Sequence, residues 1–230
     1  MIKSKNTGQI IVISAPSGAG KGTIIKKLLE NNSKNRWLSI SATSRKPREG
    51  EKEGVNYYYL TEKEFKEKIK ENYFLEYAEY AGNYYGTPRE YIKEKITQGI
   101  DVILEIEIQG ANNIKKLIPE ALFIFIMPPS LKELVRRLKG RGTETNDKII
   151  KRFNTAYKEV NEVTKYNYVV VNDEIDTAVD KIEAIIKAEK CRVDRIEEVY
   201  LDTKEEEIHE LLINEEFNNS GLGDKIWENK

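Results

Sequence analysis

Histidine and cysteine are almost absent from this chain of 230 residues, which contains only His209 and Cys191. A single cysteine cannot form an intramolecular disulfide and offers no spacing of metal ligands. The histidine lies in an acidic segment near the C-terminus, which argues against Ser-His-Asp or Cys-His nucleophilic catalysis. Any chemistry is therefore expected from carboxylates, lysines, arginines and the backbone.

Long apolar runs are also missing. No stretch approaches the roughly 20 apolar residues of a membrane-spanning helix, and the start MIKSKNTGQ lacks the apolar core of a signal peptide. The formal net charge of −1 gives no general attraction to nucleic acid or lipid headgroups. We therefore expect a cytoplasmic protein with neither a membrane nor a nucleic-acid partner, and the sequence leaves a homo-oligomer open.

The nearly neutral charge conceals an asymmetry along the chain. Residues 197–230 carry eleven acidic and three basic side chains, a net charge of −8, which leaves +7 on residues 1–196. A basic body suits anionic ligands, whereas a charge-rich terminal segment is more often a solvated appendage than a site. We expect one domain over residues 1–196, followed by an acidic C-terminal extension over 197–230.

Apolar segments of strand length alternate with amphipathic helical segments. Strands are expected at residues 9–14, 37–41, 101–107, 122–127 and 168–171. A helix is expected at 21–30, and capping boxes at Thr87 and Ser130 are expected to begin two more. The alternation predicts an α/β fold with a central parallel sheet covered by helices, in which right-handed crossovers bring the ligand-binding loops to one edge.

Residues 41–87 interrupt this alternation. They contain a charged helix from Glu62 and two aromatic strand segments, 74–81 and 84–85, joined by a Gly-Asn turn. Antiparallel structure is thus inserted into a parallel frame. An insert at the ligand-binding edge is expected to form a binding lobe for a second substrate.

The stretch SAPSGAGKGT, residues 14–23, lies between the first apolar strand and a helix. Gly18, Gly20 and Gly22 allow successive backbone N–H groups to turn toward one anion, and the helix directs its positive end at the same point. Lys21 can then reach the outer phosphates of a nucleotide. An ordinary strand-to-helix turn is the alternative, but the residue pattern after an apolar run favours a phosphate-binding loop.

This loop departs from the Walker A pattern G-x-x-x-x-G-K-[ST] at two positions. Ala15 takes the place of the first glycine, and Gly22 takes the place of the residue whose hydroxyl faces magnesium, with Thr23 one position later. A loop of backbone N–H groups tolerates the alanine. Thr23, a water molecule or the nucleotide would have to supply the missing ligand.

Two arginine-rich segments add positive charge. In the first, SATSRKPREG, Arg45 and Arg48 flank a proline, and two guanidinium groups this close repel each other unless an anion lies between them. Tyr57 and Tyr85 can add hydroxyl donors to the same phosphate. A solvated basic turn is the alternative for this segment, and the sequence alone does not decide between them.

The second segment, RRLKGRGTETNDKIIKRF, carries Arg136, Arg137, Arg141 and Arg152. Arg141 lies between two glycines, as at a hinge, so a lid could carry it onto a transferring phosphoryl group. A surface helix-loop-helix with solvated arginines is the alternative.

Together, the phosphate loop, the insert and the second arginine segment resemble the bacterial guanylate kinase family, P-loop nucleoside monophosphate kinases. The motifs that carry the resemblance are APSGAGKGT, SRKPREGE, VNYYYL, FLEYAEYAGNYYGTP, LEIEIQGA, RLKGRGTET and VVVND, between about residues 9 and 195. It implies a mixed α/β GMP-binding lobe at about 41–87 and a small helical lid at about 137–152. It also implies transfer of the ATP γ-phosphoryl group to GMP, with Mg²⁺ as cofactor, giving GDP and ADP.

The resemblance also implies roles for individual residues. The implied catalytic residues are Lys21, Arg45, Arg137, Arg141 and Arg152. The implied ATP-binding residues are Ala15, Pro16, Ser17, Gly18, Ala19, Gly20, Lys21, Gly22, Thr23 and Asn172. The implied GMP-binding residues are Ser41, Arg45, Arg48, Tyr57, Glu76, Tyr85, Thr87 and Glu107. Thr23 and Glu105 are the implied contacts to magnesium, largely through water and the nucleotide phosphates.

Two other functions stay open at this point. Guanylate-kinase-like domains also occur as non-catalytic modules that bind phosphopeptides, and a kinase of the same fold could act on another phosphorylated acceptor, such as a sugar phosphate. The intact loop lysine and lid arginines argue against the first, and Glu76 against the second. Within FLEYAEY, Glu79 has a similar local position, and strand alternation allows only one of these two carboxylates to face a pocket. The family motif selects Glu76.

Overall fold

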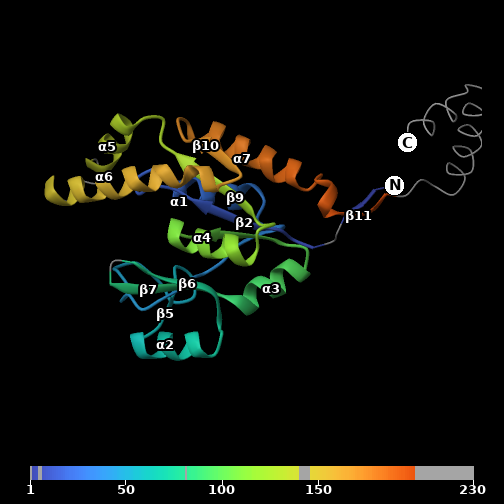
Figure 1. Ribbon diagram of the computed structural model, residues 1–230, viewed down its shortest axis with the longest axis horizontal. Coiled ribbons are helices and arrows are strands. Elements are labelled where there is room, and N and C mark those ends of the chain that lie inside the picture. Colours follow the sequence, from blue (N-terminus) through green and yellow to red (C-terminus); the bar gives the residue numbers. More distant parts are fainter. Residues whose placement is uncertain (1, 5–6, 81, 140–145, 200–230) are drawn as a thin grey trace, which may run out of the picture. The chain divides into compact units, whose positions relative to one another are not determined.

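The structure, a computed structural model, describes most of the chain (Figure 1). The described residues are 2–4, 7–80, 82–139 and 146–199. Arg141, predicted at the tip of a lid, and most of the predicted extension 197–230 lie outside them. Among the described helices, none has the length and apolar character needed to cross a membrane.

Contacts between residues divide the chain into two units. The smaller unit is Met1–Lys5 with Lys190–Lys230, and the larger unit is Asn6–Glu189. In the smaller unit two short strands pair antiparallel. Its described elements are β1 (Ile2–Ser4), the 3-10 helix η2 (Val193–Arg195) and β11 (Ile196–Val199). The predicted domain boundary at residue 196 stays a prediction.

A five-stranded sheet forms the centre of the larger unit (Figure 1). In spatial order its strands are β10 (Tyr168–Val171), β9 (Leu122–Met127), β2 (Ile10–Ser14), β8 (Asp101–Glu105) and β3 (Arg36–Leu38). All neighbouring strands run parallel. The three central strands are almost continuously apolar and buried, which fits a sheet covered on both faces. The predicted central parallel sheet is confirmed.

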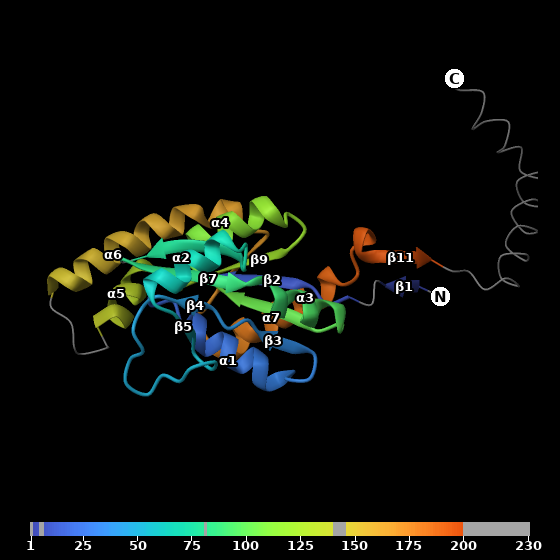
Figure 2. The same cartoon turned by 90° about the horizontal axis from the view of Figure 1, so that it is seen from below.

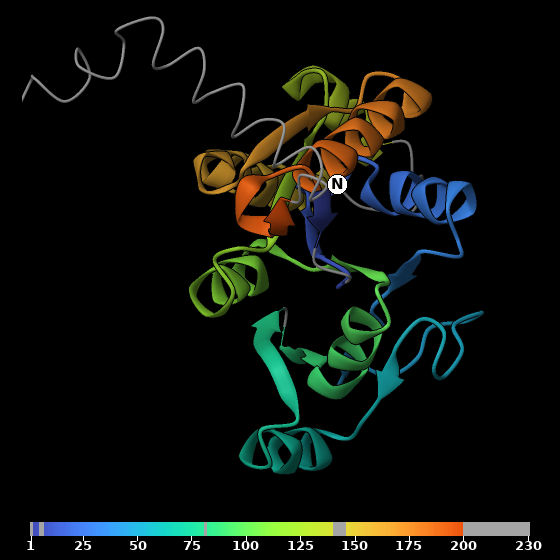
Figure 3. The ribbon, with the colours of Figure 1, turned by 90° about the vertical axis from the view of Figure 1, so that its right-hand side faces the viewer.

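Helices cover both faces of this sheet. The helices of the larger unit are α1 (Lys21–Asn31), α2 (Glu62–Lys70), α3 (Arg89–Thr97), α4 (Ile108–Leu117), α5 (Leu131–Lys139), α6 (Asn146–Val160) and α7 (Ile175–Glu189), with the 3-10 helix η1 (Asn161–Lys165). Apolar residues of α1 and α7 share one core with the sheet, and those of α3 and α4 share another. In Figure 3, α1 and α7 accordingly lie above the sheet, with α3 and α4 below it.

The insert at 41–87 forms a second sheet on the side of α3 and α4 (Figures 1 and 2). In spatial order its strands are β5 (Tyr58–Tyr59), β4 (Ala42–Thr43), β7 (Asn83–Pro88) and β6 (Phe74–Tyr80). β7 pairs antiparallel with β4 and β6, whereas β4 and β5 run parallel. α2 covers this sheet through Phe65, whose ring stacks on Phe74 at 4.4 Å between centroids. The insert is therefore a mixed α/β lobe with its own small core.

The capping box predicted at Thr87 is wrong. Thr87 belongs to β7, where pairing with β6 holds it extended, and α3 begins two residues later, at Arg89. Pro88 is the N-cap residue and makes no side-chain cap. The Thr87 hydroxyl instead donates to Glu76 Oε1 at 2.7 Å. Tertiary strand pairing has overridden a local helix-start signal.

Two strands of the central sheet end earlier than predicted. β8 ends at Glu105 because the chain then turns into α4, for which Glu107 is the N-cap residue. β3 ends at Leu38, before the chain crosses to the insert at Ala42. In both cases an isoleucine, Ile40 or Ile106, follows the last paired residue, so the apolar pattern alone placed the strand ends too late.

We expect the start of α2 to depend on Thr61. Its Oγ1 accepts from Glu64 N at 3.2 Å, and Glu64 Oε2 accepts from Thr61 N at 2.7 Å, which completes a capping box. Thr61→Ala should lower the free energy of unfolding by about 1 kcal/mol, because the backbone N–H of Glu64 loses its partner. Urea denaturation measures this. Thr61→Ser should restore most of the loss, and equal stability of all three proteins would show that the cap contributes nothing.

Candidate nucleotide site

The loop between β2 and α1 turns at Gly18 and Gly20. Their φ angles of 92° and 91° lie in the left-handed region that favours glycine. A Cβ on Gly20 would also stand 2.5 Å from Asn172 Nδ2. Gly22 lies in the first turn of α1 without a positive φ, so the predicted bending by three glycines holds for two of them.

Lys21 begins α1, and its side chain reaches the carboxyl end of β8. Nζ lies 3.5 Å from the carbonyl oxygen of Ile106, which also accepts from Ser14 Oγ at 2.9 Å. Nζ lies 3.6 Å from Glu107 Oε1 as well. The lysine side chain is 14% exposed. Its ammonium is thus held at the edge where parallel sheets bind ligands, and a glutamate at position 107 is long enough to reach it.

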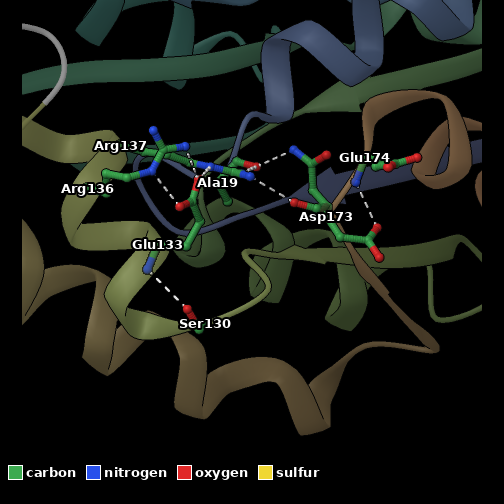
Figure 4. A network of polar contacts seen from close by, with 8 residues as sticks. Ala19, Ser130, Glu133, Arg136, Arg137, Asp173 and Glu174 are labelled. Carbon is green, nitrogen blue, oxygen red and sulfur yellow. Dashed lines mark hydrogen bonds and ion pairs between the residues drawn. The ribbon is translucent and has the colours of Figure 1, made fainter.

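Arg137 of α5 (Figure 4) and Asn172, the residue after β10, hold the phosphate loop by hydrogen bonds. Asn172 Nδ2 donates to the carbonyl oxygen of Ala19 at 2.7 Å. Arg137 donates to the same oxygen at 3.3 Å and to the backbone oxygen of Asn172 at 3.1 Å. Its Nε donates to Glu133 Oε1 at 2.8 Å. Glu133 therefore orients the Arg137 guanidinium toward the carbonyl oxygen of Ala19.

A cavity of about 820 Å³ opens beside this network. Four predicted nucleotide-site residues line it: Gly20, Thr23, Arg137 and Asn172. Asn172 is 3% exposed, and within the described part of the chain its Oδ1 has no hydrogen-bond partner. Ala15, Pro16 and Ala19 have no polar side-chain atoms, so they can bind a ligand only through the backbone.

α6 adds Arg152 and Glu159 to the phosphate loop. Arg152 Nη2 donates to Ser17 Oγ at 2.8 Å, and Ser17 N donates to Glu159 Oε2 at 3.4 Å. Burial raises the pKa of Glu159, and the nearby carboxylate of Glu107 raises it further. Glu159 is not among the predicted site residues. Its only signal was a spacing of two helical turns from Arg152.

A second cavity, of about 140 Å³, lies between the insert and the carboxyl end of β8. Six residues predicted for the GMP and metal sites line it: Ser41, Tyr57, Glu76, Tyr85, Glu105 and Glu107. Ile106, Gln109 and Gly110, which the prediction did not include, also line it. Residues from both sheets and from the start of α4 therefore meet at one pocket.

Glu76 is the buried carboxylate of this second cavity. Its residue is 7% exposed, whereas Glu79 is exposed, so strand alternation separates the two in the predicted way. Thr87 Oγ1 donates to Oε1. Burial raises the pKa of Glu76 to about 7, and the Thr87 hydrogen bond only partly offsets that rise. The carboxyl group thus titrates closer to neutral pH than an ordinary glutamate does.

Gly110 leaves room for the Glu76 carboxylate. A Cβ at Gly110 would stand 2.9 Å from Glu76 Oε2. We expect Gly110→Ala to displace that oxygen and to weaken binding of a ligand at Glu76 several-fold, while helix propensity in α4 improves by about 0.5–1 kcal/mol. Calorimetric titration with GMP, together with thermal unfolding, measures both effects. Lost stability with unchanged binding would contradict this role of Gly110.

Neither Arg45 nor Arg48 lines the second cavity, but Arg45 contacts Tyr57, which does. The Arg45 guanidinium is 5.3 Å from the centre of the Tyr57 ring, and the rings of Tyr57 and Tyr85 meet edge to face at 6.0 Å. The side chain of Arg48 is exposed. One anion beside Arg45 belongs to the chain itself: Glu51 accepts from the guanidinium of Arg45 and from the backbone N–H of Arg48, and the predicted contact of both guanidinium groups with one phosphate stays a prediction.

Comparison with known proteins decides the family of this chain. The family model for guanylate kinase matches residues 7–189. The chain belongs to the guanylate kinase family. It is 58% identical to guanylate kinase of Clostridium acetobutylicum over 203 residues, 88% of this chain and 96% of that protein. It is 57% identical to guanylate kinase of Clostridium tetani over 205 residues, 89% of this chain and 98% of that protein.

A solved structure supports the same assignment. The crystal structure of guanylate kinase from Anaplasma phagocytophilum superimposes with a TM-score of 0.71 at 33% identity, covering 92% of this chain and 96% of that chain. The predicted P-loop kinase fold is therefore confirmed. As a member of the guanylate kinase family, the chain is an ATP:GMP phosphotransferase, a nucleoside monophosphate kinase.

The few carboxylates near the phosphate loop suit a metal ion that is held mainly by water and substrate phosphates. No group of three or more His, Cys, Asp or Glu side chains within the described residues could hold a metal. Glu105 Oε1 lies 3.9 Å from the position of a Cβ on Gly22, at the start of α1, next to Thr23. One carboxylate and one hydroxyl beside a phosphate loop suit Mg²⁺, which keeps several waters and binds substrate phosphates.

Proposed function

We propose that this guanylate kinase binds ATP at the cavity of about 820 Å³ and GMP at the cavity of about 140 Å³. The γ-phosphoryl group of Mg²⁺-bound ATP then passes to GMP, giving GDP and ADP. One observation carries this assignment. Gly20 and Thr23, on either side of Lys21, line the first cavity, while Lys21 Nζ lies 3.6 Å from Glu107, which lines the second. Lys21 thus stands where the two phosphate groups must meet.

Glu76 supports guanine as the acceptor base. Guanine presents two adjacent donors, the ring N1–H and the exocyclic amine, and an ionised carboxylate offers two acceptor oxygens to them. Thr87 already holds Oε1 of that carboxylate, and Ser41 lines the same cavity. Arg45, Tyr57 and Tyr85 lie together beside it and suit the phosphate of the same nucleotide.

The remaining cations suit the transferring group. Phosphoryl transfer needs alignment of the reacting oxygens and neutralisation of charge, rather than a protein nucleophile. Lys21 and Arg152 hold positive charge at the phosphate loop, and Arg137 supports the loop from behind. Mg²⁺, when bound, supplies further charge neutralisation between the phosphates. Thr23 and Glu105 would hold it, in part through water.

A coupled assay of the purified protein tests this function. ATP with Mg²⁺ is supplied with GMP, AMP, CMP, UMP or ribose 5-phosphate, and release of ADP is followed. We expect turnover with GMP far above that with the other acceptors, and its loss when EDTA removes the metal. Turnover with the sugar phosphate would indicate a kinase of another acceptor. No turnover with any acceptor would favour the non-catalytic binding module.

A further inference from the structure

The turn that follows Arg45 brings the Glu51 carboxylate back onto the guanidinium. Oε1 accepts from Arg45 Nη2 at 2.9 Å, and Oε2 accepts from Nη1 at 3.0 Å, so the pair is bidentate. Oε2 also accepts from Arg48 N at 2.8 Å and from the Tyr59 hydroxyl at 2.9 Å. The two paired side chains are only 14% and 18% exposed. Four donors thus hold one carboxylate in one place.

These contacts use only the two terminal nitrogens of the guanidinium, Nη1 and Nη2. Of the five N–H groups of an arginine, Glu51 takes one from each terminal nitrogen of Arg45, and the carbonyl oxygen of Lys46 takes another from Nη1 at 2.7 Å. Within the described part of the chain, the N–H of Nε and the second N–H of Nη2 are not used by these two partners. They lie side by side on one edge of the planar group, as a second fork.

That second fork matches a phosphate. Two parallel N–H donors from one guanidinium bind two phosphate oxygens in fixed geometry. Arg45 lies over the ring of Tyr57 and within hydrogen-bonding reach of the Tyr85 hydroxyl, and both tyrosines line the second cavity. With one fork filled by Glu51, only the other can meet a phosphate bound there.

We propose that Glu51 is a positioning residue for the acceptor phosphate. It stays bound to one fork of Arg45 during the reaction, fixes the plane of the guanidinium against Tyr57, and leaves the other fork for the phosphate of GMP. This inference rests on the proposed function. It gives Glu51 no contact with substrate, and its effect passes entirely through Arg45.

The alternative is that Glu51 competes with the phosphate for Arg45 and has to leave before GMP binds. The two roles predict changes of opposite sign in GMP affinity when Glu51 is replaced. A positioning residue raises GMP affinity, so its loss weakens binding. A competing anion lowers GMP affinity, so its loss strengthens binding. The Arg45 guanidinium holds the pKa of Glu51 at about 2, so the carboxylate is ionised at every pH at which either role matters.

Steady-state kinetics of Glu51→Gln separate these roles. An amide keeps the size of the side chain, but turns one donor toward the guanidinium and loses the charge. We expect the KM for GMP to rise tenfold to a hundredfold, as roughly expected for a lost charge-assisted hydrogen bond, with the KM for ATP within twofold of wild type. Glu49→Gln, an exposed neighbour in the same turn, is the matched control and should behave as wild type. A lower KM for GMP would overturn the proposal.

Two binding measurements exclude a merely structural effect. By calorimetry, Glu51→Gln should weaken GMP but bind guanosine, which lacks the phosphate, as wild type does. In the Arg45→Ala background, Glu51→Gln should have no further effect, because the residue through which it acts is gone. Equal losses for guanosine and GMP, or additive losses with Arg45→Ala, would overturn the proposal. A wild-type protein that does not bind GMP would instead overturn the proposed function itself.

Discussion

Lys21→Ala is expected to lower kcat by a factor of about 10²–10³ while the protein stays folded. In the proposed reaction, negative charge shifts between the phosphates as the γ-phosphoryl group leaves ATP. Lys21 holds its ammonium at the meeting point of the two cavities, 3.6 Å from Glu107 Oε1. An interaction that strengthens in the transition state affects kcat more than it affects ground-state binding.

The fold should tolerate this substitution. The ammonium is bound at 3.5 Å to one backbone carbonyl, which keeps its hydrogen bond from Ser14 when the lysine is removed. Its acidic partner, Glu107, is half exposed and can be solvated. Lys34→Ala, an exposed lysine beyond α1, is the control and should keep wild-type kcat and unfolding behaviour. A folded Lys21→Ala protein with the wild-type rate would refute the role of this loop.

The phosphate loop could be predicted because the residues that define it follow one another in the sequence. An apolar strand, a glycine-rich turn, a lysine and a helix follow one another within residues 10–31, and the structure keeps that order. The parallel sheet could also be predicted from the sequence, because buried strands of a parallel sheet are apolar on both faces. Local sequence therefore predicted the frame and the place of the phosphate loop, whereas Arg137 and Asn172, which also line the first cavity, were expected only from the family resemblance.

The second cavity could be predicted only in part, because tertiary contacts assemble it. Arg45 was identified by its charge, but its carboxylate partner Glu51 lies six residues away across an irregular turn that has no periodicity to read. Gly110 matters only because α4 passes close to Glu76, a contact between elements far apart in the sequence. Thr87 carried a helix-start signal that strand pairing cancelled. Such contacts depend on how the elements pack.

Glu76→Gln is expected to reduce kcat/KM for GMP by one to two factors of ten, roughly 1.5–3 kcal/mol for a charge-assisted hydrogen bond. The amide offers one acceptor and one donor where guanine presents two donors. KM for ATP should barely change, because Glu76 lines only the second of the two cavities. Glu79→Gln, on the exposed face of the same strand, is the matched control. Unchanged selectivity for GMP over AMP would place the guanine contact elsewhere.

The pH dependence gives the same carboxylate a second, independent test. Burial raises the pKa of Glu76 to about 7, and only the ionised form accepts both guanine donors, so GMP affinity should rise with pH up to about 7 and level off above it. The phosphate of GMP titrates near pH 6, but it does so equally with wild type and with Glu76→Gln. The ratio of their affinities therefore isolates Glu76 and should shrink below pH 7.

Protein stability should change with pH in the opposite direction. Between a pKa near 4.5 in the unfolded chain and about 7 in the folded one, the folded state binds more protons, so the free energy of unfolding falls as pH rises through this window. Glu76→Gln should remove that fall and be the more stable protein at pH 8, while binding GMP less well. Urea denaturation at pH 5 and pH 8 measures the difference. Parallel stability curves for the two proteins would mean that Glu76 ionises in the folded state at its ordinary pKa.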